Sequence, residues 1–341
     1  MTIADAHGDL LLELAYRAKL ERPFAALWEP AMRAGGVRLQ VCAVWVPPRH
    51  HPGSTLRVAL QQVAACHRAV AETPGVRLVR TRGDLARLAA DPDELGLLLA
   101  LEGCEPLGED AGLLPVFWEL GVRMFGLTWA RPNAFGSGDG DPIDRGLTAA
   151  GRDLVGAIAA HGGVLDLAHA SPRTFWDAFE AVGERTATIV SHTGCRELFD
   201  IPRNLADDQM AAIAGRGGVV GMMAHPLATG PEHGTLDGLV RHVAHACAAA
   251  GDAHVAIGGD FAEQLAASGA YEAAPEERVL PGGAQIGAPL TGFEDPARYP
   301  ALRAALEASG LPAATVAGVL GGNLIRVLER ALPQQPAGVR G

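Results

Sequence analysis

Short apolar runs alternate with longer amphipathic segments along most of this chain. Eight of the runs are rich in β-branched residues and predict strands, whereas the segments between them carry the spacing of apolar positions that is typical of helices. The predicted strands are 3–9, 36–46, 96–102, 122–128, 163–169, 187–192, 218–224 and 254–260. The predicted helices include 55–72, 147–160, 172–182, 205–216 and 236–250. Continuous apolar strands that alternate with helices indicate a buried parallel sheet.

The number of strand–helix units favours a closed barrel. Eight units predict an α/β fold of the (β/α)8 (TIM) barrel type, with extra terminal helices and long βα loops. The alternative is an open doubly wound sheet, which needs a glycine-rich phosphate-binding turn after an early strand. The glycine-rich stretch 136–141 (GSGDGD) follows a long loop and carries acids where a phosphate needs donors, so we interpret it as a flexible loop.

The chain shows no shift in composition that would mark a linker. We therefore predict a single barrel domain over residues 1–332 and a flexible tail over residues 333–341. Residues 262–300 are rich in glycine, proline and acids and are too long for an ordinary connection. Such segments are usually lids or irregular excursions near a site.

Composition narrows the class of protein. Hydrophobic residues make up 48% and charged residues 20% of the chain, as in a globular protein with a substantial core. The net charge of −11, without a block of Lys or Arg, argues against nucleic acid and against an anionic membrane surface as partners. Polar residues interrupt the first run, and the chain has no apolar stretch near the ~20 residues of a membrane span, so we expect a cytoplasmic location. The five cysteines form no CxxC pair, so we expect neither a disulfide framework nor a zinc ribbon, and four of the five lie in apolar contexts that predict buried thiols.

Polar side chains gather at the ends of the predicted strands. They are His7 and Asp9 after the first run, Glu102 after the third, His169 after the fifth, His192 after the sixth and Asp260 after the eighth. Taken alone, His7 and Asp9 could equally be the polar lip of a surface strand. The carboxyl ends of all barrel strands meet at one face, which carries the active site in such barrels. The joint pattern therefore predicts a metal site at this face.

Two sets of histidine and carboxylate ligands that share Glu102 could hold two divalent ions. Imidazole and carboxylate suit zinc best, with manganese and cobalt as alternatives. His225 ends the seventh run and can also face the cleft, whereas we expect the remaining histidines to be structural or solvated. Asp5 alternates with His7 and Asp9, one layer deeper, and is expected to support the ligands rather than to bind metal.

Several motifs together resemble a known family. "DAHGDL", "ALEG", "LDLAHAS", "SHTGCRELFDIPRNLADDQ", "HVAIGGDF" and "GGNLIRVLE" are similar, in order and spacing, to motifs of the membrane (renal) dipeptidase family of zinc metallopeptidases, peptidase family M19. The resemblance runs from residue 3 to about residue 330. It implies an amidohydrolase-like (β/α)8 barrel with two zinc ions that hydrolyses dipeptides, with some activity on β-lactam and dehydropeptide substrates.

The resemblance also implies roles for individual residues. His7 and Asp9 would hold one metal ion, His169 and His192 the other, and Glu102 would bridge both. Arg203, in "PRNLADD", would pair with the C-terminal carboxylate of the substrate, and Asp260 would carry the proton from the nucleophilic water to the leaving amine.

The chain departs from the family pattern at two points. Trp129 stands where well-studied members have a histidine that contacts the tetrahedral intermediate, and "DFAE" stands where "DFDG" is common.

From these residues we expect a binuclear metal-dependent dipeptidase. It would hydrolyse short peptides that have a free C-terminal carboxylate, through a metal-bridging hydroxide. Arg203, Trp129 and His225 are the expected substrate-binding residues. The partner is a dipeptide or another small molecule, and a homodimer is a candidate assembly. The alternative is a related metal-dependent amidohydrolase that acts on a lactam, an N-acyl amino acid or a pathway intermediate.

Overall fold

The computed structural model describes residues 2–184, 186–261 and 288–334. Its strands are β1 (Ile3–Asp5), β2 (Val37–Trp45), β3 (Val76–Leu78), β4 (Leu95–Glu102), β5 (Val122–Gly126), β6 (Val164–Asp166), β7 (Thr188–Thr193), β8 (Val220–Met223) and β9 (Val255–Gly258). Its helices are α1 (Leu10–Tyr16), α2 (Pro23–Leu27), α3 (Glu29–Gly35), α4 (Thr55–Glu72), α5 (Arg82–Ala90), α6 (Leu114–Glu119), α7 (Ala149–His161), α8 (Pro172–Val182), α9 (Asp207–Gly215), α10 (Pro226–Thr229), α11 (Leu236–Ala250), α13 (Tyr299–Ala308), α14 (Ala313–Ala317) and α15 (Asn323–Ala331).

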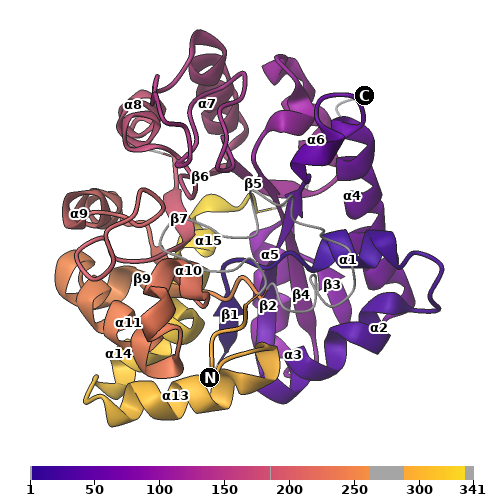
Figure 1. Cartoon of the computed structure of the whole chain (residues 1–341). Coiled ribbons are helices and arrows are strands. Elements are labelled where there is room, and N and C mark those ends of the chain that lie inside the picture. The colour runs from indigo at the N-terminus through magenta and orange to yellow at the C-terminus, as the bar shows by residue number, and fades with distance from the viewer. Residues whose placement is uncertain (1, 185, 262–287, 335–341) are drawn as a thin grey trace.

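All strand pairings are parallel and close into a barrel. The order β2-β1-β9-β8-β7-β6-β5-β4 returns to its start because β2 also pairs with β4. Helices surround the strands, with α4 and α6 on one side and α9 and α11 on the opposite side (Figure 1). The predicted (β/α)8 barrel is therefore confirmed, and each of the eight predicted strands overlaps a barrel strand. The sequence analysis missed β3, a short strand that pairs with the first residues of β4 outside the barrel circuit.

Several helices begin where the chain supplies an N-cap. The Ser171 hydroxyl accepts a hydrogen bond from Thr174 N at the start of α8, and the Thr235 hydroxyl accepts one from Gly238 N at the start of α11. Such caps satisfy amide groups that have no partner inside the helix. They explain why the predicted helices 172–182 and 236–250 begin at the first residues of α8 and α11.

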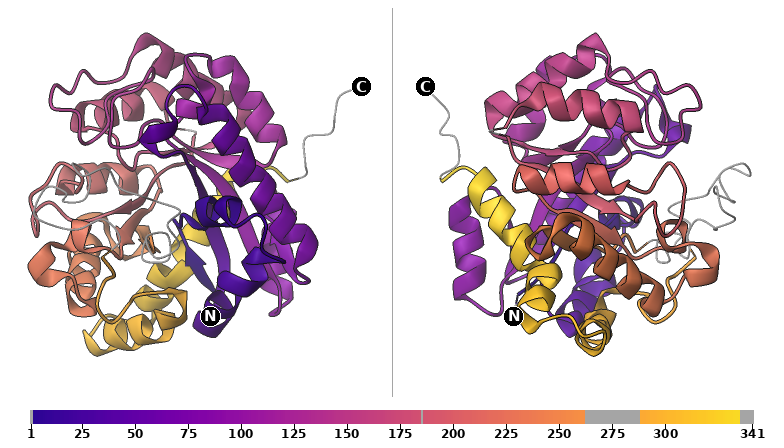
Figure 2. Two further views of the ribbon diagram at one scale, coloured as in Figure 1. Left: turned by 45° about the vertical axis from the view of Figure 1, so that its right-hand side comes forward. Right: turned by 90° about the vertical axis from the view of Figure 1, so that its left-hand side faces the viewer.

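The inside of the barrel forms a core of its own. Inward-facing residues of the strands, such as Leu98 and Ala100 of β4, pack together with residues of α5 and α15. These two helices, about 240 residues apart in the chain, lie side by side at one end of the molecule (Figure 2). The amino end of the barrel is thus closed by apolar side chains, which leaves the carboxyl end for polar groups.

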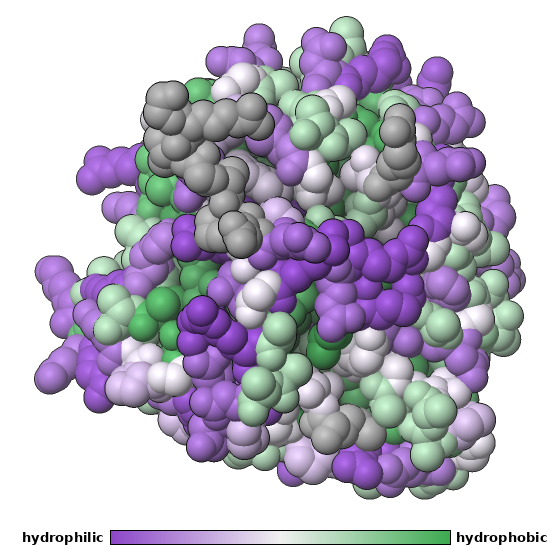
Figure 3. All heavy atoms as spheres, turned by 180° about the vertical axis from the view of Figure 1, so that it is seen from behind, coloured by the Kyte–Doolittle hydropathy of each residue, from purple (hydrophilic) through white to green (hydrophobic). Residues whose placement is uncertain are grey.

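The surface of the protein carries both hydrophilic and hydrophobic side chains (Figure 3). Seen from behind, hydrophilic side chains gather in a band across the middle of the molecule, with small groups of hydrophobic residues around it (Figure 3). Within the described residues, no helix has the length and apolar character needed to cross a membrane. All five cysteines are buried free thiols, one more than the four that the sequence predicts to be buried.

Two sequence predictions fall largely outside the described residues. Of the predicted lid, 262–300, the part 262–287 is not described, and the remainder packs into the protein through the buried residues Leu290 and Phe293. Of the predicted tail, only residues 333 and 334 are described, and the Pro333 carbonyl accepts a hydrogen bond from Arg82 N.

Candidate metal centre

Glu102 is the last residue of β4 and points into the carboxyl end of the barrel. Side chains alternate between the two faces of a strand, so Leu98, Ala100 and Glu102 share one face. Leu98 and Ala100 belong to the inner core, and Glu102 is therefore the polar top of an apolar stack. Its side chain is only 9% exposed, which is costly for a carboxylate without a cation.

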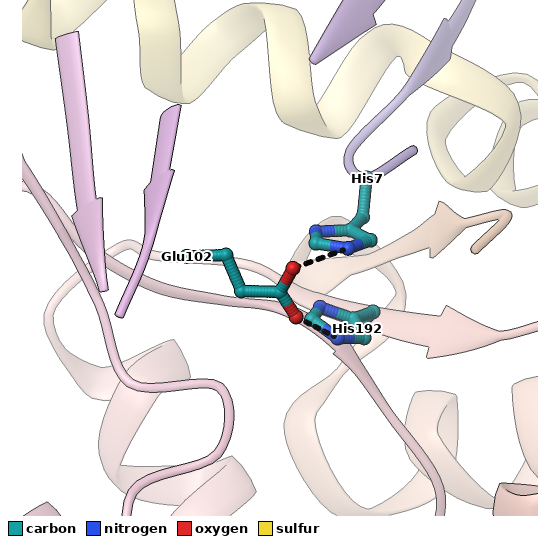
Figure 4. Close-up of side chains that lie close together, drawn as sticks. All are labelled: His7, Glu102 and His192. Atoms are coloured by element: carbon teal, nitrogen blue, oxygen red, sulfur yellow. Dashed lines mark ion pairs between the residues drawn. The ribbon is translucent and has the colours of Figure 1, made fainter. Parts of the chain in front are cut away.

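The two oxygens of Glu102 face different histidines (Figure 4). Oε2 lies 3.5 Å from Nε2 of His7, which follows β1. Oε1 lies 3.0 Å from Nε2 of His169, which follows β6, and 3.5 Å from Nε2 of His192 in β7. Nε2 of His169 and Nε2 of His192 are themselves 3.2 Å apart. One carboxylate therefore joins two groups of nitrogen donors.

Two further carboxylates complete the group around His7. Nε2 of His7 lies 3.8 Å from Oδ1 of Asp9 and 3.7 Å from Oδ1 of Asp260, which follows β9. His7, Asp9 and Asp260 thus offer three ligand atoms within 4.8 Å of one another, and so do His7, Glu102 and His192. The structure brings together all six residues that the sequence analysis placed at the strand ends.

β1 and β6 end earlier than predicted, and each of them ends at an aspartate. Asp5 ends β1, and its Oδ1 accepts hydrogen bonds from His7 N at 3.1 Å and Gly259 N at 2.8 Å. Asp166 ends β6, and its Oδ1 accepts from Ala168 N at 3.0 Å and Ser191 N at 2.9 Å. Each aspartate therefore binds a backbone amide just beyond the end of its own strand and a second amide in or after a neighbouring strand. Asp5 thus contacts the backbone of His7, and its role as a support for the ligands stays a prediction.

Two of the site residues have unusual backbone conformations. His169 has φ 62° and Asp260 has φ 48°. Both angles lie in the left-handed region, which residues other than glycine rarely adopt. Among the described residues other than glycine, only Arg22 and Asp144 also have positive φ. Strain of this kind persists where the surroundings hold a functional residue in place.

Burial disfavours the charged form of the ionisable side chains at the centre. It raises the pKa of Glu102 and of Asp9 well above their usual values. The charges of Asp9 and Asp260 add to the shift of Glu102, and the charge of Asp260 adds to that of Asp9. Burial also raises the pKa of Asp260, to about 6. It lowers the pKa of His169 to about 4 and that of His192 well below the usual value, so both imidazoles are neutral. Neutral imidazoles are the form that binds metal.

The donor atoms fit divalent cations. Nε2 of His7, Oδ1 of Asp9 and Oε2 of Glu102 are buried and make no hydrogen bond. Groups of this kind cost free energy unless a partner satisfies them, and nitrogen and oxygen donors in this mixture suit zinc. Cations bound here would compensate the charge of three carboxylates, Asp9, Glu102 and Asp260, and the neutral imidazoles would supply further donor atoms.

Arg203 lies beside the donor cluster. It follows β7, is 8% exposed, and its Nη2 is buried without a hydrogen-bond partner. Burial is the main reason why the pKa values of His169 and His225 are lowered, and the positive charge of Arg203 lowers both further. Nε of Arg203 forms an ion pair of 3.4 Å with Oδ2 of Asp139.

Asp139 is a site residue that the sequence analysis missed. It lies in the stretch 136–141, which was interpreted as a flexible loop, yet its side chain is 7% exposed and contacts His169 as well as Arg203. The available signal was an acid in a long loop after a barrel strand, on the face that carries the other acids.

Of the remaining predicted substrate-binding residues, Trp129 lies beside His169, and His225 is close enough to Arg203 to be affected by its charge. Nδ1 of His225 accepts a hydrogen bond from Leu227 N at 3.0 Å, and burial lowers its pKa to about 4. Its other nitrogen therefore carries the hydrogen. The ring of Trp129 lies 5.9 Å from the ring of His169 and 5.1 Å from that of Trp45. An aromatic wall thus stands beside the donor cluster.

Curated relatives are dipeptidases or uncharacterised proteins. An uncharacterised dipeptidase of Schizosaccharomyces pombe is 28% identical over 69% of this chain and 53% of its own length. Dipeptidase 3 of Rattus norvegicus is 28% identical over 99% of this chain and 68% of its own length. The chain thus spans about half the length of the yeast relative.

Solved structures share the fold over nearly the whole chain. The crystal structure of a metallopeptidase named dipeptidase AC has a TM-score of 0.81 and 25% identity, with 97% of this chain and 99% of that chain covered. A metallopeptidase of Rhodobacter sphaeroides has a TM-score of 0.80 and 24% identity, with the same coverage.

A family model matches most of the sequence. The model of the membrane dipeptidases (Peptidase family M19) covers residues 1–274, which include every residue of the donor cluster as well as Arg203. The barrel, the donor cluster and this match agree, and the chain belongs to the membrane dipeptidase family of metallopeptidases.

Proposed function

We propose that this protein is a binuclear metal-dependent dipeptidase that hydrolyses short peptides with a free C-terminal carboxylate. The observation that carries the proposal is the position of Glu102, whose two oxygens face His7 on one side and His169 and His192 on the other. A bridging carboxylate between two groups of donors is the arrangement that a pair of ions requires.

Each group of donors would hold one ion, with zinc as the favoured metal. His7, Asp9 and Glu102 would hold the first, and Glu102, His169 and His192 the second. When bound there, such ions would supply a Lewis acid for the scissile carbonyl and would lower the pKa of the attacking water.

The residues of the chain supply orientation and proton transfer. The Arg203 guanidinium pairs with the substrate carboxylate, which fixes the peptide relative to the centre. Asp260, with Oδ1 3.7 Å from Nε2 of His7, takes a proton from the attacking water and returns it to the leaving amine. Trp129 and His225 line the space for the substrate side chains.

The proposal is tested with purified protein of known zinc content. We expect two equivalents of zinc per chain and hydrolysis of members of a panel of L,L and L,D dipeptides. The panel includes L-Ala-D-Ala, because the Rhodobacter sphaeroides relative was crystallised with a phosphinate mimic of that dipeptide. A protein that holds two zinc ions and cleaves no dipeptide of the panel is not a dipeptidase.

The alternative keeps the metal ions and changes the substrate to a lactam, an N-acyl amino acid or a pathway intermediate. It is favoured by Trp129, which places an aromatic ring 5.9 Å from His169 where the family resemblance implies a proton-bearing histidine.

Replacing Arg203 by Ala separates the two. For a dipeptidase, we expect KM for dipeptides to rise by about 10–100-fold, the value of one charge-assisted hydrogen bond, while kcat changes less. Substrates without a free carboxylate should be unaffected. An equal loss for both kinds of substrate would favour the alternative.

The homodimer and the cytoplasmic location belong to the same proposal. Light scattering of the purified protein tests the first, and fractionation of the source cells tests the second.

A further inference from the structure

One oxygen atom of Asp139 contacts both halves of the proposed site. Its Oδ2 lies 3.1 Å from Nδ1 of His169 and 3.4 Å from Nε of Arg203. We propose that Asp139 is a positioning residue that fixes the metal-binding face of His169 and the orientation of Arg203. The inference rests on the proposed function, in which His169 holds a metal ion and Arg203 binds the substrate carboxylate.

The contact with His169 determines which ring nitrogen is free. An ionised carboxylate only accepts hydrogen bonds, so Nδ1 of His169 carries the hydrogen that points to Asp139. Nε2 therefore keeps its lone pair, and it is this nitrogen that lies 3.0 Å from Oε1 of Glu102. A carboxylate behind a metal-binding histidine also raises the basicity of the ring.

Asp139 holds the backbone of His169 as well. Asp139 N donates a hydrogen bond of 2.8 Å to the His169 carbonyl, and Gly138 and Ala170 form an antiparallel bridge beside it. His169 has φ 62°, a conformation that needs support from its surroundings. Backbone and side chain of Asp139 thus act on the same residue.

The contact with Arg203 is an ion pair with one nitrogen of its guanidinium. Oδ2 of Asp139 lies 3.4 Å from Nε, and both Nε and Nη2 are buried and make no hydrogen bond. The charge of Asp139 favours the orientation in which Nε of the planar guanidinium faces it. Asp139 therefore presents the remaining nitrogen atoms to an anion in a preferred direction.

A merely structural role for Asp139 would be to hold the loop in place. The same loop has other anchors, because Ser137 Oγ donates a hydrogen bond of 2.6 Å to Asp141 and Ile143 N donates one of 3.1 Å to the same side chain. Asp141 contacts neither His169 nor Arg203 in these interactions. Asp141→Ala is therefore the matched control for a perturbed loop.

The experiment measures zinc affinity by competition with a chromogenic chelator, without any substrate. We expect Asp139→Ala to weaken zinc binding at one of the two sites by about 10–100-fold, the usual effect of losing such a partner. Asp139→Asn keeps an oxygen that accepts from both groups and should stay within about threefold of the wild type. Asp141→Ala should do the same. With dipeptides, Asp139→Ala should also raise KM, whereas Asp141→Ala should not.

The outcomes separate this inference from the proposed function. Wild-type binding of two zinc ions together with an unchanged affinity of Asp139→Ala, or an equal loss in Asp141→Ala, refutes the role of Asp139 alone. If the wild type binds no zinc, the proposed function fails and the role of Asp139 with it. Should Asp139→Ala not fold, the ¹⁵N shifts of the His169 ring in the wild type decide. Hydrogen on Nδ1 supports the inference, and hydrogen on Nε2 overturns it.

Discussion

Replacing Glu102 by Gln should have opposite effects on the metal-free and the metal-loaded protein. Burial and the charges of Asp9 and Asp260 raise the pKa of Glu102. A carboxyl group with a raised pKa in the folded state is more costly to ionise there than in the unfolded chain, so at pH 7 its charge destabilises the fold. Glutamine has almost the same shape without the charge, and its amide can donate to a neighbouring carboxylate. The metal-free variant should therefore be more stable than the wild type.

The magnitude follows from the unpartnered oxygen of Glu102. A buried acceptor without a partner, here Oε2, costs about 1–3 kcal/mol. Unfolding entropy of about 2.1 cal/mol/K per residue gives ~0.7 kcal/mol/K for a chain of this length, so 1 kcal/mol corresponds to about 1.4 °C in Tm. Glu102→Gln should thus raise Tm in a chelator by about 1.5–4 °C.

Zinc reverses the order of the two proteins. Free zinc at 100 times Kd stabilises a folded protein by about 2.7 kcal/mol per site, or about 4 °C. The wild type should gain this at both sites, whereas Glu102→Gln, which lacks the bridging charge, should gain little. Calorimetric melts in chelator and in zinc measure both shifts. Glu105→Gln is the matched control, because Oε1 of Glu105 already accepts a hydrogen bond from Asn133. A lower Tm of Glu102→Gln in chelator, or a full zinc shift, would refute the reasoning.

Two other predictions concern stability in the presence of a chelator. Nδ1 of buried His242 accepts a hydrogen bond from Cys195 N, and burial, aided by the charge of Arg241, lowers its pKa to about 4. The unfolded chain therefore binds the proton more readily, and stability falls as pH drops from about 6.5 towards 4. Between pH 7 and pH 5 the lowered pKa of His242 reduces the free energy of unfolding by about 2 kcal/mol. Urea titrations at the two pH values should show that this contribution is absent in His242→Gln. In β8, a Cβ on Gly221 would lie 1.8 Å from the Ser191 carbonyl oxygen. Gly221→Ala should lower Tm by about 4 °C, the equivalent of ~3 kcal/mol of overpacking, and an unchanged Tm would contradict the close approach of β7 and β8.

The sequence predicted the barrel and the donor cluster because both depend on a repeating pattern. The eight apolar runs are long enough to be recognised singly, and a barrel brings their carboxyl ends together. Glu102, His169 and His192 could be placed at one face without knowing any contact between them.

What the sequence analysis missed depends on contacts between distant segments. The predicted strand 163–169 extends three residues beyond β6, because Asp166 captures the amide groups that would continue the ladder. Nothing in the local pattern distinguishes that aspartate from an ordinary strand residue. Asp139 was missed for the same reason, since its role comes from His169 and Arg203, which lie 30 and 64 positions further along the chain.

The hydrogen bond from Gly259 N to Asp5 has a consequence for the order of folding. These residues are 254 positions apart, and β1 meets β9 only where the barrel closes. Contacts between such distant segments form late, because the entropy of closing a long loop must first be overcome. His7 and Asp9 therefore meet Asp260 only in a chain whose last barrel strand is in place. This half of the centre reports on completed folding, whereas Glu102, His169 and His192 come from strands much closer in the chain.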